Sequence, residues 1–471
     1  GHGAARGSCR RHALFLHRLR SETTRYSHKV WGENEMRPQN WQAMLAISVL
    51  SIGFNSHAVD RFVSTSGSNI SPYTNWTQAA ASIQTAIDAA SANDTIWVSN
   101  GIYNLGATIR LNKRVTLRSV NGAAVTRVHG NDSVRCVIIT NGATMNGFTI
   151  TGGREIIGAG VYVATGLLEN CVLKNNTAIT NALLNSGVGG GVSVQHGIVR
   201  NCLVVSNYAR TGGGGVDIYS LGVVERSSIL YNESASAAGV NMYGSDASCA
   251  LRNCLVAHNT SSGDWGGVLA WGAGCVIQLS TITANSAGGS SGGFGAFYNP
   301  TITSSIVYGN LAPSGSNYET YAWATISYGC VAPLPSGTMN IDSAPRFVSS
   351  TDNNFRLLPS SPCIDAGGAA ASVTNDLDGS PRPVDGNMDG NTMADMGCYE
   401  YWSLVPLDID TNSVTMRWMG ATNTKYRILT SADMFLPFSV LATNINGQAP
   451  ITSYSVIITN ETRFFTVGIE L

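Results

Sequence analysis

The chain has 471 residues, of which 52 are glycine and only 12% are charged. Its 28 basic and 29 acidic residues nearly cancel, and they form no basic block or domain. This balance argues against a nucleic-acid partner, because binding phosphates needs clustered lysine and arginine. Low charge with abundant glycine is typical of a turn-rich extracellular β protein.

Residues 36–58 predict a secretory signal peptide. Met36 and Arg37 precede the apolar stretch AMLAISVLSIGF, and Ser56-His57-Ala58 has the small-x-small pattern of a cleavage site. The apolar run is too short to span a membrane, although a buried strand or helix is the alternative. We therefore expect a secreted or cell-surface protein with no transmembrane segment in the mature chain. Residues 1–35 are interpreted as an upstream segment.

Residues 59–130 predict an N-terminal cap and the first coils of a solenoid. The stretch RFVSTSG reads as a strand, and residues 76–92 read as an amphipathic helix with Ile83, Ile87 and Ala90 on one face. NDTIWVSNGIYN and RVTLRSVNG read as further strands. A solenoid needs such a cap because its open end exposes core and unpaired strand edges.

Residues 131–345 carry a repeat in which an asparagine follows a small residue by five positions. The copies recur every 25 to 31 residues, which indicates a solenoid and favours a right-handed parallel β-helix over leucine-rich or propeller repeats. Equivalent residues of successive coils then lie above one another, so the asparagines are expected to stack through their amides. The asparagines are Asn176, Asn207, Asn232, Asn259, Asn285 and Asn310, and the small residues are Cys171, Cys202, Ser227, Cys254, Ser280 and Ser305. We interpret the three cysteines as small core residues rather than zinc ligands, because their spacing equals the coil length.

Glycine-led alternating segments lie between these copies, and alternation places one set of side chains inward and the other outward. The expected inward set is Val161, Val192, Val216, Val240, Val268 and Ala296. The expected outward set is Tyr162, Ser193, Asp217, Asn241, Leu269 and Phe297. Four members of the outward set are followed, two positions later, by a second outward side chain. These second side chains are Gln195, Tyr219, Tyr243 and Trp271.

Two stretches resemble known units. The series S-x-x-G-S, a tryptophan, SIQTAIDAA and DTIWVSNGIY, with the coils after it, resembles the pectate-lyase-like family of secreted bacterial β-helix proteins over about residues 60–345. PSSPCIDAGG, NDLDGSPRPVDGN and DMGCYEY, at 359–401, resemble a choice-of-anchor-Q-type segment of surface proteins from Verrucomicrobia-like and Planctomycete-like bacteria. We interpret 346–402 as the exit cap, and the resemblance implies secretion or surface display.

Residues 403–471 alternate and are rich in strand formers, which predicts a small β-sandwich of immunoglobulin or fibronectin type. The expected fold class is therefore all-β: a parallel β-helix with a short N-terminal capping helix and a C-terminal sandwich.

The outward face of the coils is the expected binding site. Aromatic rings bind the C–H faces of sugars and polar groups fix the hydroxyls, so a stripe rising one strand per coil suits an extended polysaccharide. The alternative is a face that is covered by a loop or packed on itself. The candidate binding residues are Gln195, Tyr219, Asn241, Tyr243, Trp265 and Trp271.

Asp217, Arg210 and Asp264 are the candidate catalytic residues. A glycoside hydrolase needs two facing carboxylates, and Asp217 would need a partner from a loop, either Asp264 or Asp246. The family resemblance implies a lyase base, for which Arg210 is best placed. The outward set lacks the clustered aspartates expected of a calcium-dependent pectate lyase, and this departure argues against lyase activity.

Two features of the exit cap predict bound metal or covalent linkage. Asp385, Asn387 and Asp389 match the first half of an EF-hand loop, and Asp395 falls one short of the closing position, so Ca²⁺ is a candidate cofactor. The alternative is an Asp- and Gly-rich turn. Cys363 and Cys398 are a candidate disulfide, or two small buried residues.

These patterns predict an exported carbohydrate-active β-helix protein that binds an extended polysaccharide or cell-surface glycan. Depolymerisation by a lyase or a glycoside hydrolase stays open. The alternative is a non-catalytic surface adhesin or structural stalk, because a fold alone does not define a function.

Overall fold

A computed structural model describes most of the chain after the first 57 residues. The described residues are 58–180, 186–244, 248–320, 324–368, 373–387, 389–402, 404–410, 413–419, 425–431, 439–446, 451–457 and 464–469. The expected upstream segment 1–35 and, apart from Ala58, the signal peptide 36–58 lie outside these residues. Among the described residues, no helix is long and apolar enough to cross a membrane.

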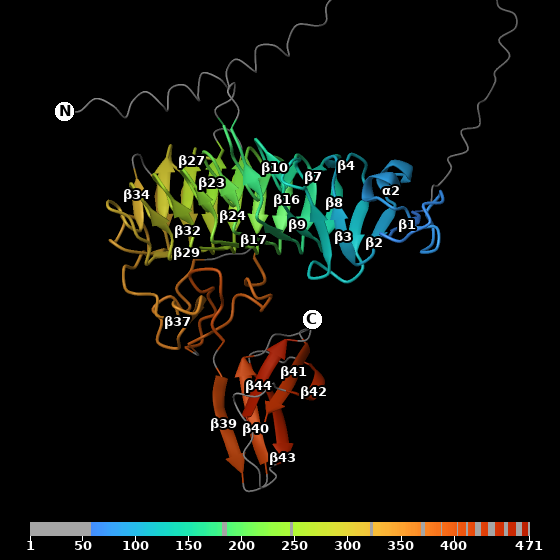
Figure 1. Cartoon of the computed structure of the whole chain (residues 1–471). Coiled ribbons are helices and arrows are strands. Elements are labelled where there is room, and N and C mark those ends of the chain that lie inside the picture. The colour runs from blue at the N-terminus through green and yellow to red at the C-terminus, as the bar shows by residue number, and fades with distance from the viewer. Residues whose placement is uncertain are drawn as a thin grey trace, which may run out of the picture. The chain divides into compact units, whose positions relative to one another are not determined.

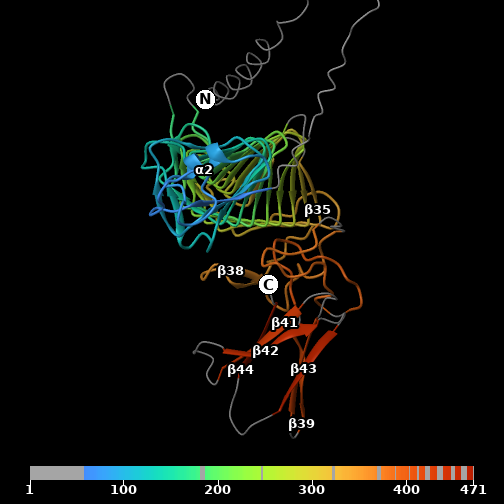
Figure 2. The ribbon, with the colours of Figure 1, turned by 90° about the vertical axis from the view of Figure 1, so that its right-hand side faces the viewer.

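The first described unit is a parallel β-helix, whose strands stack side by side along one axis (Figure 1). Each central coil adds one strand in turn to sheet A, sheet B, the short sheet D and sheet C, and then returns to sheet A. Figure 2 looks along the stack and shows the coils winding around a common axis. Inward side chains fill the space inside the coils as one hydrophobic core. The expected all-β fold class is confirmed.

Sheets A and B are the longest. Sheet A runs β1 (Asp60–Val63), β2 (Thr95–Val98), β5 (Thr116–Ser119), β8 (Ala143–Asn146), β12 (Gly166–Glu169), β16 (Ile198–Arg200), β20 (Val223–Glu225), β24 (Cys249–Arg252), β28 (Cys275–Gln278), β32 (Thr301–Thr303) and β35 (Thr325–Ser327). Sheet B runs β3 (Gly101–Asn104), β6 (Thr126–His129), β9 (Thr149–Thr151), β13 (Val172–Lys174), β17 (Leu203–Val205), β21 (Ser228–Leu230), β25 (Leu255–Ala257), β29 (Thr281–Thr283), β33 (Ile306–Tyr308) and β36 (Cys330–Val331).

Sheets C and D complete the coils. Sheet C runs β4 (Ile109–Leu111), β7 (Val137–Ile139), β11 (Val161–Val163), β15 (Val192–Val194), β19 (Val216–Tyr219), β23 (Val240–Tyr243), β27 (Val268–Trp271), β31 (Phe294–Phe297) and β34 (Tyr318–Thr320). Sheet D runs β10 (Arg154–Glu155), β14 (Thr177–Ala178), β18 (Tyr208–Ala209), β22 (Glu233–Ser234), β26 (Thr260–Ser261) and β30 (Ser286–Ala287).

The asparagines form a continuous buried stack at the turn between sheets B and D. The Nδ2 of each donates to the Oδ1 of the next at 2.9–3.0 Å, from Asn176 through to Asn310. Each Oδ1 also accepts the backbone N–H of the asparagine before it, except at the upstream end, where Gly153 donates. Asn317 extends the stack by one member, although it lies outside the repeat motif. The stack holds neighbouring coils in register because a shifted coil would leave buried amides unpaired.

The described cysteines are all buried free thiols. Cys171, Cys202 and Cys254 lie in the turn between sheets A and B and pack into the core. The predicted disulfide between Cys363 and Cys398 is wrong, because the two thiols belong to separate hydrophobic clusters. Cys363 contacts Cys330 instead. Cys249 and Cys275 are register partners on β24 and β28, with their Sγ atoms 3.3 Å apart.

The entry cap contains a shorter helix than the sequence predicts. Helix α2 spans Ile83–Ala89, and Ser82 caps it by accepting the N–H of Thr85. Ala90, although buried, is the C-cap rather than a helical residue. The preceding residues are not helical because the chain there pairs with β1, through a bridge from Ala80 to Val63.

The sixth alternating segment was predicted two residues out of register. Phe294, not Ala296, pairs with Val268, so Phe297 pairs with Trp271 and not with Leu269. A slip of two residues keeps every side chain on its expected face, and alternation alone therefore cannot detect it. The turn sets the register, since Ser291 is left-handed (φ 57°) three positions before Phe294, as Trp265 is (φ 63°) before Val268.

The remaining strands lie in the exit segment and the C-terminal region. β37 (Phe347–Ser349) and β38 (Asn354–Leu357) form an antiparallel pair in the exit segment. The C-terminal region has two three-stranded antiparallel sheets, as expected. Their strands are β39 (Leu404–Asp410), β40 (Ser413–Met419) and β43 (Ile451–Ile457), and β42 (Ser439–Asn446), β41 (Lys425–Ser431) and β44 (Phe464–Ile469).

Replacing the central stack member, Asn232→Ala, is expected to lower the free energy of unfolding by about 1–3 kcal/mol. The change removes the acceptor of Asn207 and the donor to Val204 and Asn259 in a buried turn. Guanidinium unfolding followed by circular dichroism measures the shift. The exposed Asn100→Ala is the control and should stay within about 0.5 kcal/mol of the parent; equal shifts for the two variants would contradict the role of the stack.

Candidate functional site

The outward face of sheet C carries two parallel columns of side chains. The first, which we call the polar column, holds Tyr162, Ser193, Asp217, Asn241, Leu269, Gly295 and Glu319 in register. The second, which we call the aromatic stripe, holds Tyr219, Tyr243, Trp271 and Phe297 in register. Gln195 follows Val194 as Tyr219 follows Ile218, so it stands at the upstream end of the stripe. Parallel register thus turns four separate coils into one continuous surface.

The rings of the aromatic stripe change their arrangement along its length. Tyr219 and Tyr243 stack at 5.5 Å with planes only 7° apart, so each covers a face of the other. Trp271 and Phe297 are 4.5 Å apart but tilted by 34°, and Tyr298 lies 5.1 Å from Trp271 at 57°. Tyr298 is 60% exposed. Tilted rings cannot fully cover one another, so the downstream end of the stripe is where flat aromatic surface is available to a ligand.

Sequence reasoning missed two members of this downstream cluster. Phe297 was assigned to the polar column because of the two-residue register error. Tyr298 lies just beyond β31 in a left-handed conformation (φ 59°), where no alternation pattern applies. The signal that could have assigned Phe297 to the aromatic stripe is the turn before β31, because the left-handed turn residue lies three positions before the first residue of the strand.

Trp265 supports the stripe from a coil corner. Its backbone is left-handed (φ 63°), at a position that small residues occupy in the other coils: Gly158, Gly189, Gly213, Ala237, Ser291 and Gly315. Its indole lies over Gly295, where a Cβ would come within 2.1 Å of the ring, and meets Phe297 edge-on at 5.7 Å. A bulky residue in the left-handed region is strained. Because Trp265 occupies a position that small residues hold in other coils, and its indole packs on a glycine, we interpret the contact between Trp265 and Gly295 as a specific feature of this face.

Asp217 is held by its neighbours in the polar column. It is only 8% exposed, and its carboxylate accepts hydrogen bonds from Ser193 Oγ at 2.9 Å and Asn241 Nδ2 at 2.8 Å. Burial raises the pKa of Asp217, and these two donors oppose the rise. At the upstream end, the Tyr162 hydroxyl donates to Gln195 Oε1 at 2.7 Å. The polar column therefore forms a hydrogen-bonded floor beside the stripe.

The candidate catalytic residues are not brought together. Asp264 accepts hydrogen bonds from the N–H and hydroxyl of Ser290 at 2.7 and 3.0 Å, so it closes the corner of the next coil. Arg210 is exposed beyond β18 of sheet D. Asp246 lies outside the described residues. Among the described residues, Asp217 contacts Ser193 and Asn241 and no second carboxylate.

The exit segment is organised by a buried ion network. The Arg382 guanidinium pairs with Glu400 at 2.6 Å with both side chains fully buried, and it also donates to the Tyr399 carbonyl and to Asn253 in the coils. Asp376 accepts the N–H groups of Ser380 and Glu400. A paired and fully hydrogen-bonded buried charge is costly to disrupt. These residues of the NDLDGSPRP and DMGCYEY motifs therefore fix the segment against the β-helix.

In the predicted calcium loop, side-chain oxygens accept hydrogen bonds from the loop's own backbone N–H groups. Asp385 accepts the N–H groups of Asp389 and Gly390, and Asn387 accepts that of Asp389. Asp395 is fully buried elsewhere, where it accepts the N–H groups of Asp365 and Tyr401. Among the described residues, no three His, Cys, Asp or Glu side chains are arranged to hold a metal ion. The Ca²⁺ site stays a prediction, and both carboxylate oxygens of Asp395 accept backbone N–H groups.

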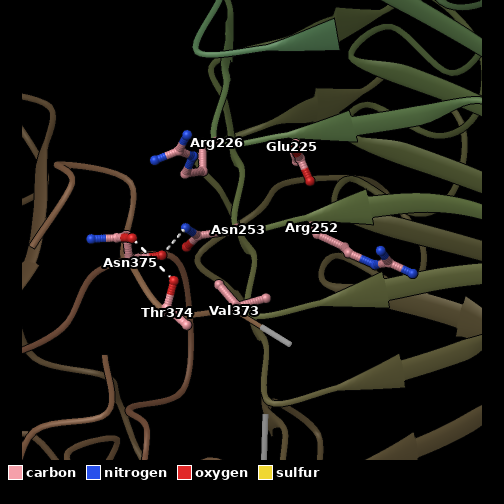
Figure 3. A pocket seen from close by; sticks show the side chains of 7 residues that line it. All are labelled: Glu225, Arg226, Arg252, Asn253, Val373, Thr374 and Asn375. Carbon is pink, nitrogen blue, oxygen red and sulfur yellow. Dashed lines mark hydrogen bonds between the residues drawn. The ribbon is translucent and has the colours of Figure 1, made fainter. Parts of the chain in front are cut away.

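A polar pocket of about 190 Å³ lies where the exit segment meets the coils. Its lining residues are Glu225, Arg226, Arg252, Asn253, Val373, Thr374 and Asn375 (Figure 3). Asn253 Nδ2 donates to the Asn375 carbonyl at 2.7 Å across the seam. In Figure 3 the guanidinium groups of Arg226 and Arg252 point to opposite sides, so the two charges do not converge on one ligand.

Comparison with known proteins gives only distant similarity. No family model matches the chain, and no curated protein matches it. Among solved structures, the chain is similar to pectate lyase Pel9A, with 15% identity and a TM-score of 0.48, covering 74% of this chain and 97% of that one. It is also similar to pectin methylesterase in complex with hexasaccharide VII, with 11% identity and a TM-score of 0.30, covering 61% of this chain and 94% of that one. The parallel β-helix is established by the strand topology above, not by these similarities.

The exit segment should lose stability as pH rises, and Asp376→Asn should weaken this dependence. Burial raises the pKa of Asp376 from 3.8 to about 6. A carboxyl with a raised folded-state pKa contributes stability that is complete below about pH 4 and is lost as pH rises through about 6. This amounts to on the order of 2–3 kcal/mol. Melting temperatures measured from acid to neutral pH should fall less steeply in the variant, and parallel curves would disprove the assignment.

Proposed function

We propose that this protein is an exported carbohydrate-active β-helix protein whose sheet C face binds an extended polysaccharide. One observation supports the proposal most: the aromatic stripe runs in register over four successive coils beside a hydrogen-bonded polar column. Neighbouring strands are about 4.8 Å apart, a repeat comparable with one sugar unit of an extended chain. Export is proposed from the sequence of residues 36–58.

The two ends of the stripe are proposed to play different parts. Trp271 and Tyr298, tilted apart by 57°, offer flat ring surface for the C–H face of a sugar. Gln195 and Tyr219 offer polar groups for the hydroxyls at the upstream end, where Tyr219 presents its edge because one ring face is stacked on Tyr243. Aromatic surface with a few placed polar groups is the usual composition of a small-molecule site.

The geometry favours binding over cleavage at this face. A glycoside hydrolase requires two carboxyl groups across the scissile bond. Asp217 has both oxygens engaged by Ser193 and Asn241, and Asp264 is engaged by Ser290. We therefore propose a binding role for the sheet C face and assign no bond cleavage to these residues.

Trp271→Ala should weaken polysaccharide binding by up to about tenfold. An aromatic contact is worth about 0.5–1.5 kcal/mol, and about 1.4 kcal/mol corresponds to a factor of ten in affinity. Affinity electrophoresis or calorimetry against a panel of soluble neutral and uronate-rich polysaccharides measures the effect, and chain shortening is followed in parallel.

Trp97→Ala is the matched control, because Trp97 is a partly exposed tryptophan on β2 of sheet A. The control should bind as the parent does. Equal losses in the two variants would place binding elsewhere, and no binding across the whole panel would favour the alternative of a structural stalk.

A further inference from the structure

We infer that the polysaccharide recognised by the aromatic stripe is uncharged, and that polyuronates are excluded. The inference rests on the proposed function and narrows its substrate class. It follows from the position of every basic side chain along the coils that carry the stripe.

Basic residues are scarce in these coils. Between Lys174 and Arg346 the sequence has no lysine and only four arginines: Arg200, Arg210, Arg226 and Arg252. The stretches 181–185, 245–247 and 321–323, which the structure does not describe, read NALLN, SDA and YAW and add no basic residue. A site that recognises the carboxylates of a polyuronate is expected to present basic side chains, preferably arginine, whose planar guanidinium matches a carboxylate.

Three of the four arginines belong to another face. Arg200 lies on sheet A between Glu169, at 2.9 Å, and Glu225, at 3.8 Å. Arg252 is the next member of that column, since it pairs in register with Glu225. Arg226 lies in the turn after β20, beside the pocket of Figure 3. These three positive charges therefore lie on sheet A or where the exit segment meets the coils, and not on the sheet C face.

The fourth arginine lies outside the two columns of sheet C. Arg210 follows β18 of sheet D, and its backbone N–H donates to Ala178. The glycines of residues 212–215 separate it from β19. Farther upstream, Arg135 donates to the carbonyls of Ile157 and Gly158 and stacks over Tyr162 at 5.6 Å, so its guanidinium is already engaged.

Beside the stripe, the formal charges on the sheet C face are instead acidic. The basic Arg110 lies on β4, two strands upstream of Tyr162 in the same column. Asp217 and Glu319 stand in the polar column, and Asp264 closes the corner beside Trp265. A polyuronate would bring one negative charge per ring toward these carboxylates, and like charges at an interface oppose binding. The hydroxyls of a neutral sugar face no such penalty, and amides such as Gln195 and Asn241 suit them.

The test compares two forms of one polymer on the full chain. Fully methyl-esterified polygalacturonate is neutral, and its de-esterified form has the same backbone with a carboxylate on each ring. We expect the parent to bind the neutral form at least tenfold more tightly at low salt, with little change when NaCl is added, because surface charge effects are screened by salt. Linear galactan serves as a second neutral probe.

Gln195→Lys provides a gain-of-function variant. A lysine at the upstream end of the stripe should raise affinity for the acidic polymer several-fold and make that binding salt-dependent, while Arg210→Ala should leave the neutral preference unchanged. Tight, salt-sensitive binding of the acidic form by the parent, lost in Arg210→Ala, would overturn the inference.

Trp271→Ala separates this inference from the proposed function. If the parent binds the acidic form and the Trp271→Ala variant does not, the stripe is the binding site and only the inference of a neutral substrate fails. If the parent binds neither form nor galactan, the proposed function fails and the inference fails with it.

Discussion

The in-register parallel stacking of coils is the constraint on which the rest of this structure depends. Backbone hydrogen bonds fix the distance between coils, but they would tolerate a slip along the strand. The buried asparagine amides do not tolerate one, since every Oδ1 after the first accepts two donors from the asparagine before it, and every Nδ2 donates to the next coil. Once the coils are in register, residues 24 or more positions apart in the chain become neighbours in a column.

The sheet C face shows what such columns can build. Stacking like on like produces a polar column in which Ser193, Asp217 and Asn241 hydrogen-bond to one another. It also produces an aromatic stripe in which neighbouring rings cover part of each other's surface. The stripe becomes open to a ligand only where the rings tilt, around Trp271 and Tyr298. That tilt coincides with the two departures from the repeat, a left-handed tryptophan at Trp265 and a glycine at Gly295. Irregularity in a repeat therefore marks the candidate site more clearly than the repeat itself does.

The exit segment shows that a dense acidic motif can serve structure. Its aspartates and Glu400 accept backbone N–H groups, and Arg382 neutralises part of their charge while reaching Asn253 in the coils. Burial explains why the pKa of Asp376 is raised. The motif packs the exit segment against the coils, where Arg382 and the Asn375 carbonyl both bind Asn253.

The sequence by itself determined the solenoid, the inward asparagines and cysteines, and which side chains face outward, because periods of two and of about 25 residues encode face and coil. It could not determine register to better than two residues, so Phe297 was assigned to the wrong column. It could not show that Asp217, Asp264 and Asp395 are engaged by neighbours, because those partners come from other coils or distant turns. Only the tertiary structure decided these points, since hydrogen-bond partners and ring tilts depend on contacts between coils that no local pattern records.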